Sequence, residues 1–135
     1  VRIVTLVDRR SGYLIAFLLP KMNARLLTSL ALQKLRPIPK TKRTTLTLDN
    51  GIEFADWERL EKGSGAIVYF AYPYHFWERG SNENTNGLLR QYFPKDLDFN
   101  LIAPGELAAV VRRLNDRPRK RLGFRTPKEV FWHAR

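Results

Sequence analysis

Two long apolar runs at the start of the chain constrain its fold more than any other feature. Residues 1–7 (VRIVTLV) and 13–19 (YLIAFLL) are rich in β-branched and aliphatic side chains, and the polar segment DRRSG separates them. Two such runs joined by a short turn predict a β-hairpin. Neither run alternates polar with apolar side chains, as a strand does when one of its faces lies in water. We therefore expect a sheet that is covered on both faces.

After the hairpin, helical spacing and β-propensity predict a succession of helices and strands. The expected elements are a helix at 24–35 capped by Asn23, a strand at 45–48, a helix at 54–62 closed by Gly63 and Gly65, a strand at 66–70, a helix from Ser81 or Asn82 to Pro94, a helix from Pro104 through Leu114, and a terminal helix opened by Thr126, Pro127 and Glu129. This order is typical of an α/β fold, a mixed sheet with flanking helices, and we expect one domain over residues 1–135.

The chain carries a large excess of positive charge. Its 24 Lys+Arg against 13 Asp+Glu give a formal net charge of +11, and residues 112–135 hold nine of the basic and two of the acidic residues. Such an excess favours a polyanionic partner, nucleic acid before an anionic membrane, with a generic basic protein as the alternative. No stretch approaches the roughly 20 apolar residues of a membrane span. We expect a cytoplasmic protein with no membrane partner.

Two acidic residues lie where rigid elements are expected to end or begin. The alternating strand TLTL ends at Asp49, and Glu83 falls in the first turn of the helix that begins at residue 81 or 82. Closing a turn is one interpretation of Asp49, because Asn50 and Gly51 follow it. Two carboxylates on separate rigid elements also suit Mg²⁺, which takes oxygen ligands. The spacing of the acids leaves both interpretations open.

Three longer segments around these acids resemble a known enzyme family. TLTLDNGIEF, YPYHFWERGSNENTNGLLRQYFPK and LNDRPRKRLGFRTPKEVF occur in this order. Together they resemble the catalytic core of DDE transposases and retroviral-type integrases, above all the bacterial insertion-sequence thirty family of transposases. The resemblance spans nearly the whole chain, and RGSNENTNG with its spacing from Asp49 is the most specific part. It implies an RNase H-like fold, three carboxylates that hold Mg²⁺ or Mn²⁺, and cleavage of DNA at element ends followed by joining to a target strand.

The resemblance also assigns roles to single residues. Asp49 and Glu83 match the second and third catalytic acids and metal ligands. Around Glu83, the residues expected to contact DNA are Arg79, Asn82, Asn86 and Arg90. Independently of the resemblance, the positive charge at 112–135 indicates that Arg117, Arg119, Lys120 and Arg121 bind phosphates, with a merely solvated basic loop as the alternative. Asp8 lies in the hairpin turn and is not assigned to catalysis. Since the family carries its first acid on a strand before the hairpin, we expect that strand and that acid upstream of Val1.

Two function classes therefore stay open. The first is the core of a polynucleotidyl transferase that acts on element ends and target DNA and could form a homodimer. Because its first acid is expected upstream, this chain alone is expected to be inactive. The second is a non-catalytic DNA-binding or self-associating remnant on the same fold.

Overall fold

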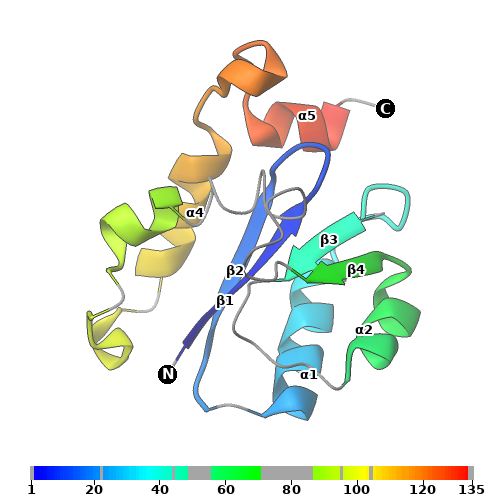
Figure 1. Cartoon of the computed structure of the whole chain (residues 1–135), viewed down its shortest axis with the longest axis vertical. Helices are drawn as coiled ribbons and strands as arrows, with labels where there is room; N and C mark the ends of the chain where they lie inside the picture. The colour runs from blue at the N-terminus through cyan, green and yellow to red at the C-terminus, as the bar shows by residue number, and fades with distance from the viewer. Residues whose placement is uncertain are drawn as a thin grey trace.

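A four-stranded mixed sheet lies at the centre of the molecule (Figure 1). The computed structural model describes residues 2–21, 23–43, 45–48, 56–70, 87–94, 96–103 and 105–133. The strands are β1 (Arg2–Asp8), β2 (Leu14–Leu19), β3 (Thr45–Leu48) and β4 (Ile67–Phe70). Their order is β2-β1-β3-β4; β1 is antiparallel to β2 and β3, and β3 is parallel to β4. The predicted hairpin and mixed sheet are confirmed.

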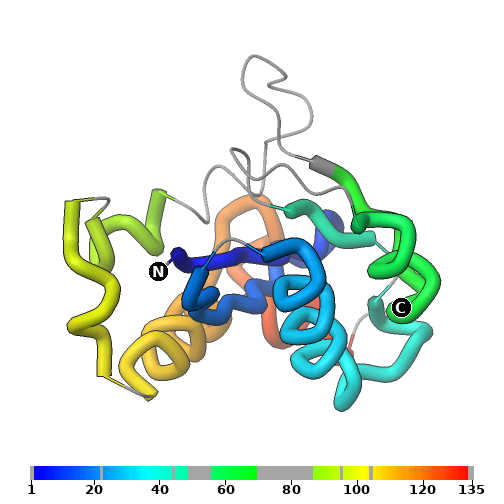
Figure 2. The backbone as a smooth tube through the Cα atoms, turned by 90° about the horizontal axis from the view of Figure 1, so that it is seen from below, coloured from blue at the N-terminus to red at the C-terminus, as the bar shows by residue number. Residues whose placement is uncertain are grey.

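The helices lie on two sides of this sheet. They are α1 (Ala24–Leu35), α2 (Trp57–Ser64), a helical segment at 87–92, the short η1 (Phe99–Leu101), α4 (Glu106–Asn115), the short η2 (Lys120–Leu122) and α5 (Pro127–His133). Figure 1 shows α4 on one side of the β1–β2 hairpin and α1 and α2 on the other, with α5 beside the hairpin turn. Figure 2 again shows the strands of the hairpin between α4 and α1. None of the described helices is long and apolar enough to cross a membrane.

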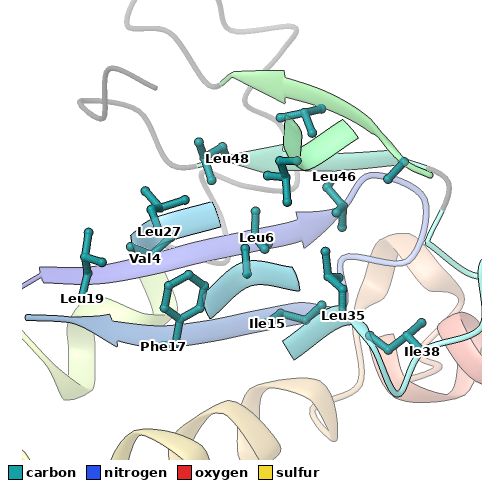
Figure 3. Packing of buried hydrophobic residues seen from close by; sticks show 14 of the residues in the cluster. Val4, Leu6, Ile15, Phe17, Leu19, Leu27, Leu35, Ile38, Leu46 and Leu48 are labelled. Carbon is teal, nitrogen blue, oxygen red and sulfur yellow. The ribbon is translucent and has the colours of Figure 1, made fainter. Parts of the chain in front are cut away.

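One hydrophobic core lies between the sheet and helices α1 and α2. It is built from side chains that alternate along the strands, such as Val4 and Leu6 of β1 and Leu48 of β3. Leu27 and Leu35, two turns apart on one face of α1, pack onto them (Figure 3). Each of these five side chains is fully buried, so this face of the sheet is closed to water.

A second core covers the other face of the hairpin. Ile3 and Val7, which alternate with the first set along β1, pack with Leu89 and Phe93 of the segment at 87–93 and with Leu114 of α4. Because both alternating sets of β1 are buried, its sequence reads as a continuous apolar run rather than as a period of two. The expected cover on both faces is confirmed for the hairpin, whereas Ile67 and Tyr69 of β4 are exposed.

Two helices begin at the capping residues that the sequence predicted. Asn23 caps α1 as predicted, since its Oδ1 accepts a hydrogen bond from the Leu26 N–H at 3.1 Å. The capping box of α5 is also confirmed: Thr126 N–H donates to Glu129 Oε1, and Glu129 N–H donates to Thr126 Oγ1, both at 3.0 Å. These contacts satisfy backbone donors that a helix start leaves unpaired.

Two helix boundaries differ from the sequence prediction. The helix expected at 54–62 runs from Trp57 to Ser64, so Gly63 lies inside it and only Gly65, with a φ of 75°, ends it. Gly63 lies close against α1, because a Cβ atom there would lie 2.8 Å from a methyl group of Leu32, which would have to shift. Helix α4 starts at Glu106 after Gly105, whose φ is 89°, and not at position 104, which lies outside the described residues.

Candidate functional site

The strand that leads to Asp49 is held on both sides. Strand β3 lies between β1 and β4, and its last residue, Leu48, pairs with Leu6 of β1 and Phe70 of β4. Leu48 is fully buried in the core shown in Figure 3. Asp49 itself lies outside the described residues. The fold therefore fixes the backbone up to the residue before the predicted ligand, and the role of Asp49 stays a prediction.

The predicted residues around Glu83 lie outside the described part of the chain. These are Arg79, Asn82, Glu83 and Asn86. The described part of the chain resumes just after them with the helical residues 87–92, and buried Leu89 and Phe93 anchor these to the sheet. Among the described residues, no group of three or more His, Cys, Asp or Glu side chains could hold a metal ion.

Arg90 is described, and its guanidinium is turned toward its own helix end. Its Nη1 donates to the carbonyl oxygen of Phe93 at 3.3 Å, and its Cζ lies 5.6 Å from the centre of the Phe99 ring. The side chain is half-buried. These contacts hold the turn that follows the helix. The predicted contact of Arg90 with DNA would therefore use those guanidinium N–H groups that do not donate to the Phe93 carbonyl.

Asp8 has a structural role in the hairpin turn. Its buried carboxylate accepts hydrogen bonds from the backbone N–H and the hydroxyl of Ser11, at 2.9 and 2.6 Å. Its own backbone N–H donates to Tyr13 O at 3.0 Å, and its carbonyl accepts from Gly12 N–H at 2.8 Å. These contacts close the turn around the carboxylate, in agreement with leaving Asp8 out of the catalytic set.

The basic residues after α4 form a turn that is bound to the hairpin turn. Arg121, although exposed, donates from Nη1 to the carbonyl oxygen of Arg10 at 3.2 Å. Arg119 is half-buried, and its Nη2 donates to Leu114 O at 3.1 Å. Two of the four predicted phosphate-binding side chains therefore also hold the turn in place. Arg117 and Lys120 are exposed.

The charges of this turn lie close enough to act on one another. Burial lowers the pKa of the Arg119 guanidinium from its ordinary value, and the positive charges of Arg117 and Arg121 lower it further. A phosphate placed among these groups would relieve this repulsion, because an anion favours their charged forms. The turn is thus an electropositive surface.

The register of the sheet separates this basic turn from the predicted acids. Strands β1 and β3 are antiparallel, with Leu6 opposite Leu48 and Asp8 opposite Leu46. The hairpin turn that holds Arg121 therefore lies at the start of β3, whereas Asp49 follows its end. The predicted DNA-binding residues thus form two groups. One group is near Glu83 in the sequence. The other group follows α4 and lies near the start of β3, at the other end of that strand from Leu48.

The sequence did not reveal the role of Asn115, the last residue of α4. Its side-chain amide accepts from the Leu14 N–H at 2.8 Å and donates to the Leu14 carbonyl at 2.9 Å. It thereby pairs with the edge strand β2 as a neighbouring strand would, and only 4% of the residue is exposed. The partner lies 101 residues away in the chain, so no local pattern could indicate the contact. Asn115 fixes the starting point of the basic turn.

Comparison with known proteins identifies the family. The chain is 43% identical over 129 residues to the transposase for insertion sequence element IS4351 of Bacteroides fragilis and to the transposase InsI for insertion sequence element IS30A of Escherichia coli (strain K12). Each of these alignments covers 96% of the chain. The transposase for IS1086 of Cupriavidus metallidurans is 40% identical over 126 residues. The chain belongs to the DDE transposase and integrase family. No family model matches it.

The structural comparison confirms the predicted RNase H-like fold of this family member. The catalytic core domain of BIV integrase superposes with a TM-score of 0.65 and 22% sequence identity, covering 98% of this chain and 86% of that one. The alignments span only 39% of the IS4351 transposase and 34% of the IS30A transposase. This chain therefore corresponds to little more than a third of the length of such a transposase.

Proposed function

We propose that this chain is the catalytic core of a transposase that cuts and joins DNA strands. The observation that carries the proposal is its 40–43% identity to proteins named as transposases, over 93–96% of its length. The likeness of its fold to an integrase catalytic core supports the same assignment. The partners in this proposal are the DNA ends of the mobile element and the target DNA.

In the proposal, Asp49 and Glu83 hold Mg²⁺ or Mn²⁺. Their carboxylates are the hard oxygen ligands that such ions take, and a rigid strand between two neighbours leads directly to Asp49. A bound metal pair activates the attacking oxygen and stabilises the leaving oxygen of a phosphodiester. The chain's own contribution is to keep both carboxylates fixed relative to the DNA backbone, since small misplacement costs rate.

A second candidate is DNA binding without catalysis. It is favoured by the basic turn, because the hydrogen bonds of Arg119 and Arg121 that hold this turn involve neither Asp49 nor Glu83. We also propose that the 135 residues alone do not cut DNA, because two of the family's three acids are assigned within them. Aligning the attacking and leaving oxygens around a metal pair needs the complete ligand set.

Strand cleavage and joining measured with Mg²⁺ or Mn²⁺ test the proposal. The assay compares this chain with the same polypeptide extended by its own flanking coding sequence. We expect activity in the extended protein, a loss of at least about 100-fold with Asp49→Asn or Glu83→Gln, and no loss with the control Asp116→Asn, which removes a charge from an exposed residue after α4. Cleavage that survives both substitutions would overturn the mechanism. An inactive extended protein that still binds DNA would favour the second candidate.

A further inference from the structure

The basic turn carries a feature that the proposed catalysis does not use. Residues 119–125 form a closed loop in which Arg119 N–H donates to Arg125 O at 3.0 Å and Phe124 N–H donates to Arg119 O at 2.8 Å. Leu122, in the middle of the loop, points inward and is buried, and its N–H also donates to Arg119 O. The loop is therefore held by its own backbone and by one apolar anchor.

Phe124 stands out from this loop in two ways. Its φ of 65° makes it the only described residue other than glycine in the left-handed region, where a bulky side chain is rarely found. Its side chain is not packed in compensation, because 70% of the residue is exposed. Backbone strain of this kind, held by surrounding structure, tends to occur at functional sites. No contact within the described chain explains why a large aromatic residue occupies this position.

The surroundings of Phe124 indicate what it could bind. No acidic residue occurs between positions 117 and 128, whereas Arg117, Lys120 and Arg125 are all exposed. The hydrogen bond from Arg121 to Arg10 brings the turn against the basic hairpin segment DRRSG. One exposed ring among cations fits a ligand that offers a flat apolar face next to negative charge. A nucleic-acid base with its flanking phosphates has this chemistry.

We propose that Phe124 stacks on a base of DNA while the surrounding cations hold the adjacent phosphates. The inference rests on DNA being the partner in the proposed function, but not on the metal site. Since the basic turn lies near the start of β3, and Leu48 at the other end of that strand precedes Asp49 in the chain, this contact would bind DNA away from the position of cleavage. An anionic membrane fits less well, because interfacial binding also needs buried apolar area, and Phe124 is the one large apolar side chain that the described turn exposes.

Binding of single-stranded and duplex oligonucleotides of one sequence, measured by fluorescence anisotropy, tests the inference. Phe124→Leu keeps an apolar side chain but removes the ring, and it should weaken single-strand binding about 5- to 150-fold, the range for loss of one stacked base. Phe124→Trp should restore the affinity. The salt dependence should stay unchanged in both variants, because the phosphate contacts remain. The matched control is Leu101→Ala, which truncates an apolar residue of η1 that is 76% exposed.

A base analogue reports stacking directly. The fluorescence of 2-aminopurine in the single strand should be quenched by the wild-type chain and by Phe124→Trp, but not by Phe124→Leu. Equal affinity and quenching with and without the ring would overturn the inference while leaving the proposed function intact. A chain that binds neither DNA form would contradict both. Ring-dependent binding to phosphatidylserine vesicles, with DNA binding unaffected, would replace the base by a lipid surface and refute the inference.

Discussion

Replacing Asn115 by Ala tests how the basic turn is attached to the sheet. The substitution removes two hydrogen bonds, of 2.8 and 2.9 Å, that join α4 to β2. It also leaves the N–H and the carbonyl of Leu14 without their partner in a site where Leu14 is 1% exposed. An ordinary hydrogen bond contributes about 0.5–1.5 kcal/mol, and each stranded buried group costs about 1–3 kcal/mol. The better helix propensity of Ala recovers only about 0.5 kcal/mol. We therefore expect a loss of about 2–4 kcal/mol in the free energy of unfolding.

Urea denaturation followed by far-UV circular dichroism measures this loss. With a slope of about 1.5 kcal/mol per molar urea, the midpoint should fall by about 1–3 M. Asp116→Ala is the matched control, because it truncates the exposed neighbouring residue and should change stability by no more than about 0.5 kcal/mol. Asn115→Asp keeps the acceptor for the Leu14 N–H but faces its carbonyl with a carboxylate, so it should also destabilise. A loss for Asn115→Ala within about 0.5 kcal/mol of the control would refute the reasoning, since the hydrogen bonds would then contribute nothing.

Three further predictions follow from other contacts. Replacing both Arg117 and Lys120 by Gln should weaken duplex binding and reduce the slope of log affinity against log salt by about 2. An unchanged slope in a filter-binding titration would exclude both side chains as phosphate contacts. Gly63→Ala should fail to give the gain of about 1 kcal/mol usual inside a helix, because its Cβ would meet Leu32 at 2.8 Å, and a full gain in urea unfolding would contradict that packing. Hydrogen bonds from Thr126 lower the pKa of Glu129 from 4.5, so the contribution of the carboxylate to stability is present above that pH and lost as pH falls through the lowered value. The difference in melting temperature between wild type and Glu129→Gln should therefore be larger at pH 7 than at about pH 3, because Gln keeps the cap but not the charge. An equal difference at both pH values would count against the lowered pKa.

The sequence predicted those parts of the fold whose signals are local. The continuous apolar runs gave the hairpin and its cover on both faces, Asn23 marked the start of α1, and the capping box marked the start of α5. Gly63 was misread, because glycine is common both at helix ends and where two helices approach closely, and only the packing of α1 on α2 distinguishes them. The amide of Asn115 could not be placed, because its partner is chosen by the tertiary fold.

The candidate site was predicted by resemblance rather than by local pattern. Acidic residues are common, and Asp49 at a strand end is equally compatible with a turn. The motifs around it led to the family, which the comparisons confirm. The sequence could not predict that the basic turn lies near the start of β3 and not near its end, because this depends on the antiparallel register of β1 and β3. Four of the ten predicted site residues follow α4 and lie at the far end of the sheet as a result.

The central claim is that Asp49 and Glu83 converge on one divalent ion. A crystal structure of the extended protein with Mn²⁺, using anomalous scattering to locate the metal, tests it most directly. The account predicts an anomalous peak within about 2.0–2.4 Å of a carboxylate oxygen from each residue, the range for oxygen ligands of such ions. The peak should disappear in the Asp49→Asn variant. Well-ordered carboxylates on opposite faces of the sheet, with any metal bound elsewhere, would contradict the account.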